Sequence, residues 1–164
     1  MGKLTGKAKK GSLAEELQQA RPFEGVPQEA YLSILRTAAE LSRQTAVYLK
    51  DYGLTPAQFN VLRILRGAGA AGLCRHEIAE RMVTAMPDVS RLLDRMEKLG
   101  WIARERSAKD RREVSTGITP AGLEKIAGLD KPMQRLHEKQ FDGVEKGKLK
   151  KLVATMTVIR EHIS

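Results

Sequence analysis

Cysteine and long apolar segments are scarce in this sequence. The 164 residues include one cysteine, Cys74, so no disulfide can close within the chain and no cysteine cluster can hold a metal. No apolar run approaches the roughly 18 residues that a membrane-spanning helix needs. The basic start, MGKLTGKAKKGS, is not followed by the apolar segment of a secretory signal peptide. We therefore expect a cytoplasmic protein with no membrane partner.

Motifs for catalysis and for cofactor binding are also missing. The three histidines, His76, His137 and His162, have no carboxylate or histidine partners at the spacing of a metal site. No glycine-rich phosphate loop and no nucleophile elbow occurs in the sequence. The sequence therefore predicts that the protein is not an enzyme and that it holds neither a metal nor another cofactor.

Positive charge is plentiful but evenly spread. The 29 basic and 20 acidic residues give a net charge of +9, which by itself indicates only a general preference for polyanions. Residues 1–26 form a basic arm with a possible short helix over residues 12–20, and the arm is either a solvated tail or a functional extension. Cys74 is either a small, half-buried side chain or a redox-sensitive thiol.

The middle of the chain has the pattern of short amphipathic helices. A long helix is expected within residues 27–53, and a second one begins at Thr55, where Thr55 and Gln58 can form a capping box around Pro56. The glycines of GAGAAG end that helix. A third helix is expected over residues 75–82, and it brings Arg75 and His76 forward as candidate phosphate contacts.

A fourth helix is expected from Pro87 to Leu99, with one apolar face and one charged ridge. The ridge has helical spacing and consists of Asp88, Arg91, Arg95 and Lys98, with Ser90 and Asp94 beside it. Such a ridge fits the major groove of DNA, where the first residues of the helix contact bases and the later ones contact phosphate. Asp88 could instead favour the helix dipole, and the whole ridge could be an ordinary solvated surface.

Two strands and a basic loop follow this helix. Residues 101–106 and 113–118 alternate as strands do, and the loop between them holds Lys109, Asp110, Arg111 and Arg112. Arginines at a hairpin tip suit the negative potential of a narrow minor groove, and Asp110 can orient the guanidinium of Arg112. We therefore predict a mainly α fold with a small β-hairpin wing, a winged helix-turn-helix DNA-binding domain over residues 54–118.

Long helices flank this predicted domain. Thr119 and Pro120 begin a fifth helix that is expected to bend near Pro132, and a last helix is expected from Lys146 to Ile163. Residues 27–53 and 119–164 are interpreted as dimerisation helices that bury their apolar stripes across a two-fold axis, as a homodimer. The proposed interface residues are Tyr31, Leu35, Leu149, Leu152, Met156, Ile159 and Ile163.

Over about residues 27 to 163, the sequence resembles the MarR family of bacterial and archaeal transcriptional regulators. The match rests on the order of LTPAQFNVL, EIAERM, VSRLLDRMEKLGWIAR, DRR and ITPAGL. The resemblance implies that Arg112 enters the minor groove with Asp110 positioning it. It also implies dimerisation through the terminal helices, and a small aromatic effector bound between these helices and the winged domain. The base-contacting residues that it implies are Asp88, Ser90 and Arg91.

We therefore interpret the chain as a sequence-specific regulator that binds double-stranded DNA at a pseudo-palindromic operator, a repressor released by a small-molecule effector. The alternative is a winged-helix module for protein assembly that binds no operator. The arginines discriminate between the two, because only a DNA-binding protein should be impaired by Arg91→Ala and Arg112→Ala.

Overall fold

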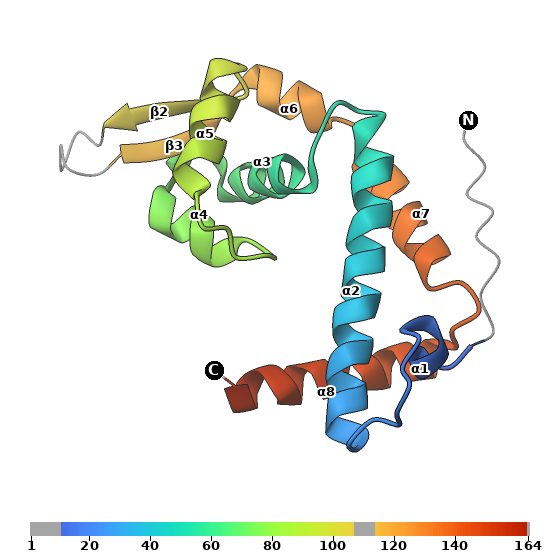
Figure 1. Cartoon of the computed structure of the whole chain (residues 1–164). Coiled ribbons are helices and arrows are strands. Elements are labelled where there is room, and N and C mark those ends of the chain that lie inside the picture. The colour runs from blue at the N-terminus through green and yellow to red at the C-terminus, as the bar shows by residue number, and fades with distance from the viewer. Residues whose placement is uncertain (1–10, 107–113, 164) are drawn as a thin grey trace. The chain divides into compact units, whose positions relative to one another are not determined.

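The computed structural model describes residues 11–106 and 114–163. The chain divides into two compact units, Met1–Tyr48 and Leu49–Ser164, and each is described by itself. Figure 1 shows the elements, which are mostly helices with one small sheet. Among the helices described, none combines the length and the apolar character that crossing a membrane requires.

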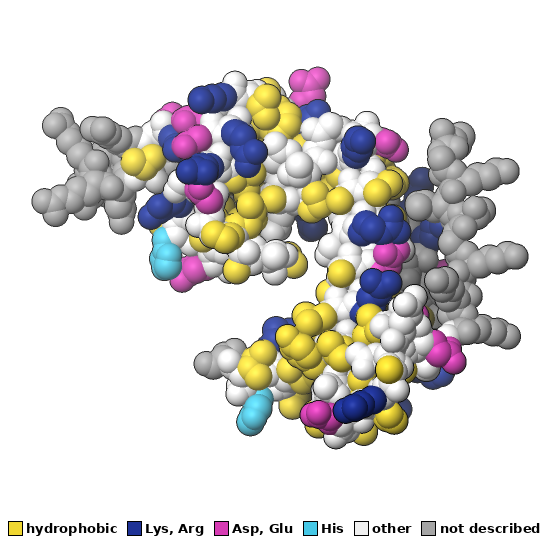
Figure 2. Space-filling model, viewed as in Figure 1, with side chains coloured by type: hydrophobic (Ala, Val, Ile, Leu, Met, Phe, Trp, Pro, Cys, Tyr) yellow, Lys and Arg dark blue, Asp and Glu magenta, His cyan; other side chains and the backbone are white. Residues whose placement is uncertain are grey.

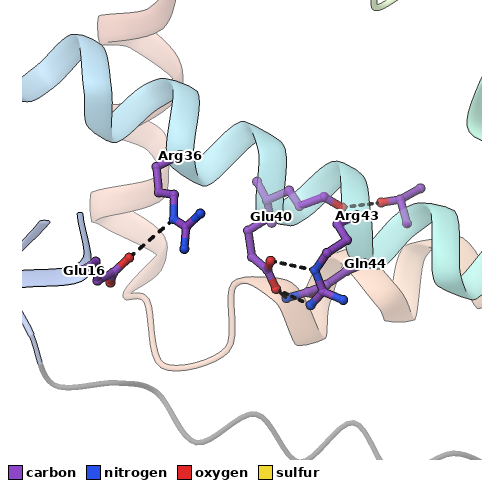
Figure 3. Close-up of polar contacts among 7 residues, drawn as sticks. Glu16, Arg36, Glu40, Arg43 and Gln44 are labelled. Atoms are coloured by element: carbon purple, nitrogen blue, oxygen red, sulfur yellow. Dashed lines mark hydrogen bonds and ion pairs between the residues drawn. The ribbon is translucent and has the colours of Figure 1, made fainter. Parts of the chain in front are cut away.

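The first unit consists of a single helical turn and a long helix. α1 (Leu13–Glu16) begins at Ser12 with a capping box, and it is shorter than the expected segment 12–20 because Gln18 takes a left-handed conformation with φ 50°. α2 (Val26–Lys50) then runs over the expected range. The Glu16 carboxylate lies 3.7 Å from the Arg36 guanidinium, so an ion pair joins the two helices (Figure 3).

One face of α2 is occupied by polar contacts. Arg43 donates hydrogen bonds of 2.8 and 2.7 Å to the two carboxylate oxygens of Glu40, and Gln44 donates a third at 3.0 Å (Figure 3). These bonds, with the Arg43 hydrogen bond the largest cause, lower the pKa of Glu40 to about 2. By helical rotation this face lies opposite Tyr31 and Leu35. The apolar stripe of α2 is therefore free of this polar cluster.

The second unit begins with the expected capping box. The Thr55 hydroxyl accepts from the Gln58 N–H at 3.2 Å, the Gln58 side chain accepts from the Thr55 N–H at 2.9 Å, and Pro56 opens α3 (Pro56–Ala68). Gly69 ends the helix with φ 64°, a conformation that favours glycine. Phe59, Val61, Leu62 and Leu65 form the buried stripe of α3.

A three-stranded antiparallel sheet follows in the order β1-β3-β2. β2 (Ile102–Arg106) and β3 (Val114–Ile118) are the two strands of the expected hairpin. β1 (Leu73–Cys74) was not expected from the sequence and pairs Leu73 with Thr116. The helices α4 (Arg75–Arg81) and α5 (Val89–Lys98) lie between β1 and β2 in the chain.

The core of this unit is built from the apolar stripes of the short helices and one face of the sheet. Burying each of these side chains stabilises the unit by about 1.5–3 kcal/mol. The largest fully buried members are Leu49, Leu62, Leu65, Ile78, Leu93, Met96, Ile102 and Ile126. This core fixes α5 and the hairpin on the same small scaffold.

The fifth expected helix is two helices, and the interruption predicted near Pro132 lies before that residue, between Ile126 and Asp130. α6 (Pro120–Ile126) ends before Gly128, which has φ 74°, and α7 (Asp130–Gln140) begins two residues later. Pro132 stands in the first turn of α7, where a missing N–H costs little.

Arg66 on α3 forms a bidentate ion pair with Asp130, the first residue of α7, at 3.0 and 2.7 Å. The hydrogen bonds of this pair lower the pKa of Asp130.

α8 (Lys146–Ile163) is the last helix, as expected, and it contains no buried residue. The side chains of Leu152, Ile159 and Ile163 are 44, 37 and 74% exposed, while Leu149 and Met156 are half-buried. Figure 2 shows hydrophobic side chains gathered over α8. The apolar stripe of this 18-residue helix is therefore exposed in part along its whole length.

Candidate nucleic-acid interface

The charged helix α5 begins later than the sequence indicated. Asp88 is its N-cap, because its carboxylate accepts from the Arg91 N–H at 3.0 Å, and the first helical residue is Val89 rather than Pro87. Val89, Leu92, Leu93 and Met96 anchor the helix in the core.

The predicted ridge of α5 lies on the exposed side of the helix. The Arg91 side chain is 84% exposed and its Nε lies 2.9 Å from the second carboxylate oxygen of Asp88. Arg95 and Lys98 are exposed on the following turns, and the Arg95 Nε donates to the Arg91 carbonyl at 3.4 Å. Figure 2 shows basic and acidic side chains interspersed over α4 and α5. Arg91 is thus a highly exposed cation of the ridge, with Asp88 beside its guanidinium.

Arg75 and Ser90 join α4 to the start of α5. The Arg75 guanidinium donates to the Ser90 hydroxyl oxygen at 3.0 Å, across a hollow of about 200 Å³ between the helices. His76 lines the same hollow, and its Nε2 lies 3.1 Å from the Glu80 carboxylate. The structure therefore brings together Arg75, His76 and Ser90, which the sequence placed in one interface.

A hydrogen bond to α3 stabilises the turn between α4 and α5. The Asn60 side-chain oxygen on α3 accepts from the Val83 N–H at 3.0 Å. The helix-turn-helix segment is thus tied to α3 by a polar contact as well as by the buried side chains of Ile78 and Leu93.

Arg104 on β2 is a site residue that the sequence interpretation missed. Its Nη2 donates to the Asp94 carboxylate on α5 at 2.7 Å, and its Nε lies 3.7 Å from Glu97. The alternation of side chains along a strand could have predicted its orientation, because Arg104 lies two residues after the buried Ile102 and so faces the same side of the sheet. Strand and helix are therefore linked through one guanidinium.

The wing residues Lys109, Asp110, Arg111 and Arg112 lie outside the described residues, and their roles stay predictions. The strands on either side are described, and their pairing extends to Arg106 and Val114.

Cys74 is half-buried as the N-cap of α4. Within residues 11–106 and 114–163, no group of histidine, cysteine, aspartate and glutamate could hold a metal ion.

Two further surface features lie outside the α4–α5 region. Tyr31 and Leu35 on α2 are 61 and 49% exposed. A hollow of about 330 Å³ lies between α3 and α7, with an apolar floor from Phe59 and Met133. Its polar lining consists of Arg63, Asp130, Gln134, His137 and Glu138.

Residues 54–114 match the model of the MarR family. A MarR transcription factor from Planctomyces limnophilus has a similar structure, with a TM-score of 0.63 and 32% identity over 84% of this chain and 99% of that chain. An uncharacterised HTH-type transcriptional regulator from Bacillus cereus is 29% identical over 134 residues, which are 80% of this chain and 87% of the relative. These similarities span the helices on both sides of the hairpin.

Two more distant structures share the fold. Sco3205 from Streptomyces coelicolor, a MarR family regulator solved in complex with DNA, has a TM-score of 0.75 and 22% identity over 87% of this chain and 92% of that chain. The organohalide-sensing regulator RdhR-CbdbA1625, solved with bound 2,4-dichlorophenol, has a TM-score of 0.76 and 21% identity. That likeness covers 88% of this chain and 87% of the other.

Proposed function

Because the chain belongs to the MarR family of transcriptional regulators, we propose that it binds a specific duplex DNA operator as a homodimer, with α5 in the major groove. The observation that carries this proposal is the ridge of α5. Its cations are exposed, while the opposite face of the same helix is fixed in the core. A rigid helix with one projecting polar face is the form in which major-groove readers present side chains to bases.

The roles within the ridge follow from the contacts. Both carboxylate oxygens of Asp88 are engaged, one by the backbone of Arg91 and one by its side chain. Asp88 therefore orients Arg91 through its Nε, and the two Nη nitrogens of the guanidinium would offer a bidentate fork to guanine. Arg95 lies one turn further from the start of the helix and serves as a phosphate contact, together with Arg75 and His76 on α4.

A dimer sets the form of the operator. Two copies of α5 related by a two-fold axis would contact half-sites about 34–36 Å apart, one turn of DNA. The operator would then be pseudo-palindromic. The exposed stripes of α2 and α8 support such a dimer, because each presents large apolar side chains that the chain itself leaves uncovered.

Removing the Arg91 side chain tests the DNA-binding role. Arg91→Ala should weaken operator binding by about 1–3 kcal/mol and relax base preference at one position, because a bidentate contact is lost. The measurement is fluorescence anisotropy of duplexes selected from fragments of the source genome. Lys139→Ala, which removes one exposed charge from the last turn of α7, is the matched control and should keep base preference. Unchanged binding by Arg91→Ala would favour the protein-assembly module.

The same proposal includes repression relieved by a small aromatic molecule. The hollow between α3 and α7 supports it, because the volume suits a small ligand and the floor of Phe59 and Met133 is apolar. Arg63 and His137 at its polar lining could orient a phenol oxygen. The proposed dimer would have two conformations, one in which the two copies of α5 match the operator and one in which they do not. A ligand that binds the second conformation more tightly would lower operator affinity by the ratio of its affinities for the two.

Filling this hollow tests the effector site. Gln134→Trp places a large ring at the lining of the hollow without removing a core side chain, since Gln134 is exposed. With 2,4-dichlorophenol as the probe, we expect release of the duplex from the wild type, release from Arg135→Trp on the neighbouring exposed position, and no release from Gln134→Trp. Equal release from both variants would place the effector elsewhere.

A further inference from the structure

α5 and its N-cap, which the proposed function places in the major groove, carry as many acidic as basic residues. Residues 88–98 include Arg91, Arg95 and Lys98 against Asp88, Asp94 and Glu97, so the segment has no net positive charge to present to a polyanion. Asp88 is occupied at the helix start. Asp94 and Glu97 lie three residues apart on a flank of the ridge, where their charges would repel DNA phosphates.

Arg104 contacts both of these carboxylates. It donates to Asp94 at 2.7 Å and forms an ion pair of 3.7 Å with Glu97, while its own side chain is only 25% exposed. Its Nε is buried and makes no hydrogen bond, which is a costly state for a guanidinium. The Glu97 carboxylate, 3.7 Å away, is the negative charge that faces this nitrogen.

The same flank of α5 is held at its other end. Arg75 donates to Ser90 near the helix start, and Arg104 donates to Asp94 one turn later. One arginine comes from α4 and the other from β2, so the ridge is oriented relative to both the preceding helix and the hairpin. Ser90 and Asp94, four residues apart, therefore serve as anchor points on the flank.

We propose that Arg104 is a positioning residue for DNA binding: it fastens α5 to β2 and screens Asp94 and Glu97 from the phosphates of bound DNA. The proposal rests on the proposed function, since the screening matters only if α5 lies against DNA. It differs from a direct contact role, because Arg104 acts through two carboxylates and not through the nucleic acid.

The test compares Arg104→Met with the triple variant Arg104→Met/Asp94→Asn/Glu97→Gln. The probe is a fluorescein-labelled duplex pool of about 30 bp, titrated between about 50 and 200 mM salt, because phosphate repulsion acts on any sequence. We expect Arg104→Met to weaken binding about tenfold or more and the triple variant to recover most of that loss. Arg135→Met, which removes an exposed arginine from α7, should change binding by less than about threefold.

Hydrogen exchange of the α5 amides supplies a readout that needs no DNA. Exchange should rise in Arg104→Met and stay raised in the triple variant, because both lose the fastening to β2. Wild-type affinity in Arg104→Met overturns the proposal. A triple variant without recovery overturns the screening role, because the loss of binding would then not come from the two exposed carboxylates, and unchanged exchange in Arg104→Met overturns the fastening. A wild-type protein that binds no duplex refutes the proposed function, and the exchange data still report whether the fastening exists.

Discussion

We expect Leu152→Asp together with Ile159→Asp to convert the proposed dimer into a monomer and to abolish high-affinity operator binding. The two side chains lie seven residues apart on the stripe of α8 and are 44 and 37% exposed in the single chain. Replacing them therefore removes little from the core of the second unit. In a two-fold interface each change occurs twice, and each lost apolar side chain is worth about 1.5–3 kcal/mol before the cost of burying a carboxylate is added.

The effect on DNA binding follows from the loss of bivalency. In a dimer the second recognition helix binds as an intramolecular event, which raises affinity by about 10²–10⁴ over a single module. The monomer should therefore bind a full operator no better than a half-site. Sedimentation velocity measures the association state, and anisotropy with full and half operators measures the binding.

The control for this experiment is the opposite face of the same helix. Lys150→Asp together with Ala154→Asp changes the charge of α8 more strongly, at exposed positions on the opposite face. This variant should remain a dimer and keep the preference for the full operator. A dimer that survives in the stripe variant, or a monomer that binds the full operator with wild-type affinity, would refute the interpretation of α8 as the dimer interface.

What the sequence predicted correctly was encoded locally. The start of α3 is predictable from Thr55, Pro56 and Gln58, because a capping box is a contact between residues that are close in the sequence. The extent of α2 and α8 follows from helical spacing of apolar residues in the same way. The family assignment drew on these local segments, and it is confirmed by the family model and by the Planctomyces structure.

What the sequence did not predict depends on contacts between distant segments. β1 is two residues long and exists because Leu73 pairs with Thr116, far along the chain. The link from Arg104 to Asp94 crosses from a strand to a helix and has no spacing rule. The break after α6 lies at Gly128 and not at Pro132. A proline is tolerated in the first turn of a helix, and the sequence alone does not show where that turn begins.

Gly122→Ala will destabilise the second unit although alanine is the better helix former. Gly122 lies in the first turn of α6, is buried, and has no room for a side chain: an added Cβ would collide with the backbone carbonyl oxygen of Trp101 and lie 2.9 Å from Ile118. That carbonyl also accepts the Thr119 N–H at 3.1 Å, so it cannot move without weakening the helix cap. The overpacking cost of about 1–3 kcal/mol exceeds the gain of up to about 1 kcal/mol from helix propensity.

Gly67→Ala gives the matched control with the opposite sign. Gly67 lies in α3, where an added Cβ would meet nothing within 4 Å, so only the propensity gain of about 0.5–1 kcal/mol applies. Urea unfolding at one fixed protein concentration, followed by the fluorescence of Trp101, the chain's one tryptophan, measures both variants. Because Trp101 joins the end of α5 to the start of β2, a shifted carbonyl at this residue would also disturb α5. A Gly122→Ala protein as stable as the wild type would contradict this prediction. It would mean that the backbone between α5, β2 and α6 shifts at little cost in free energy.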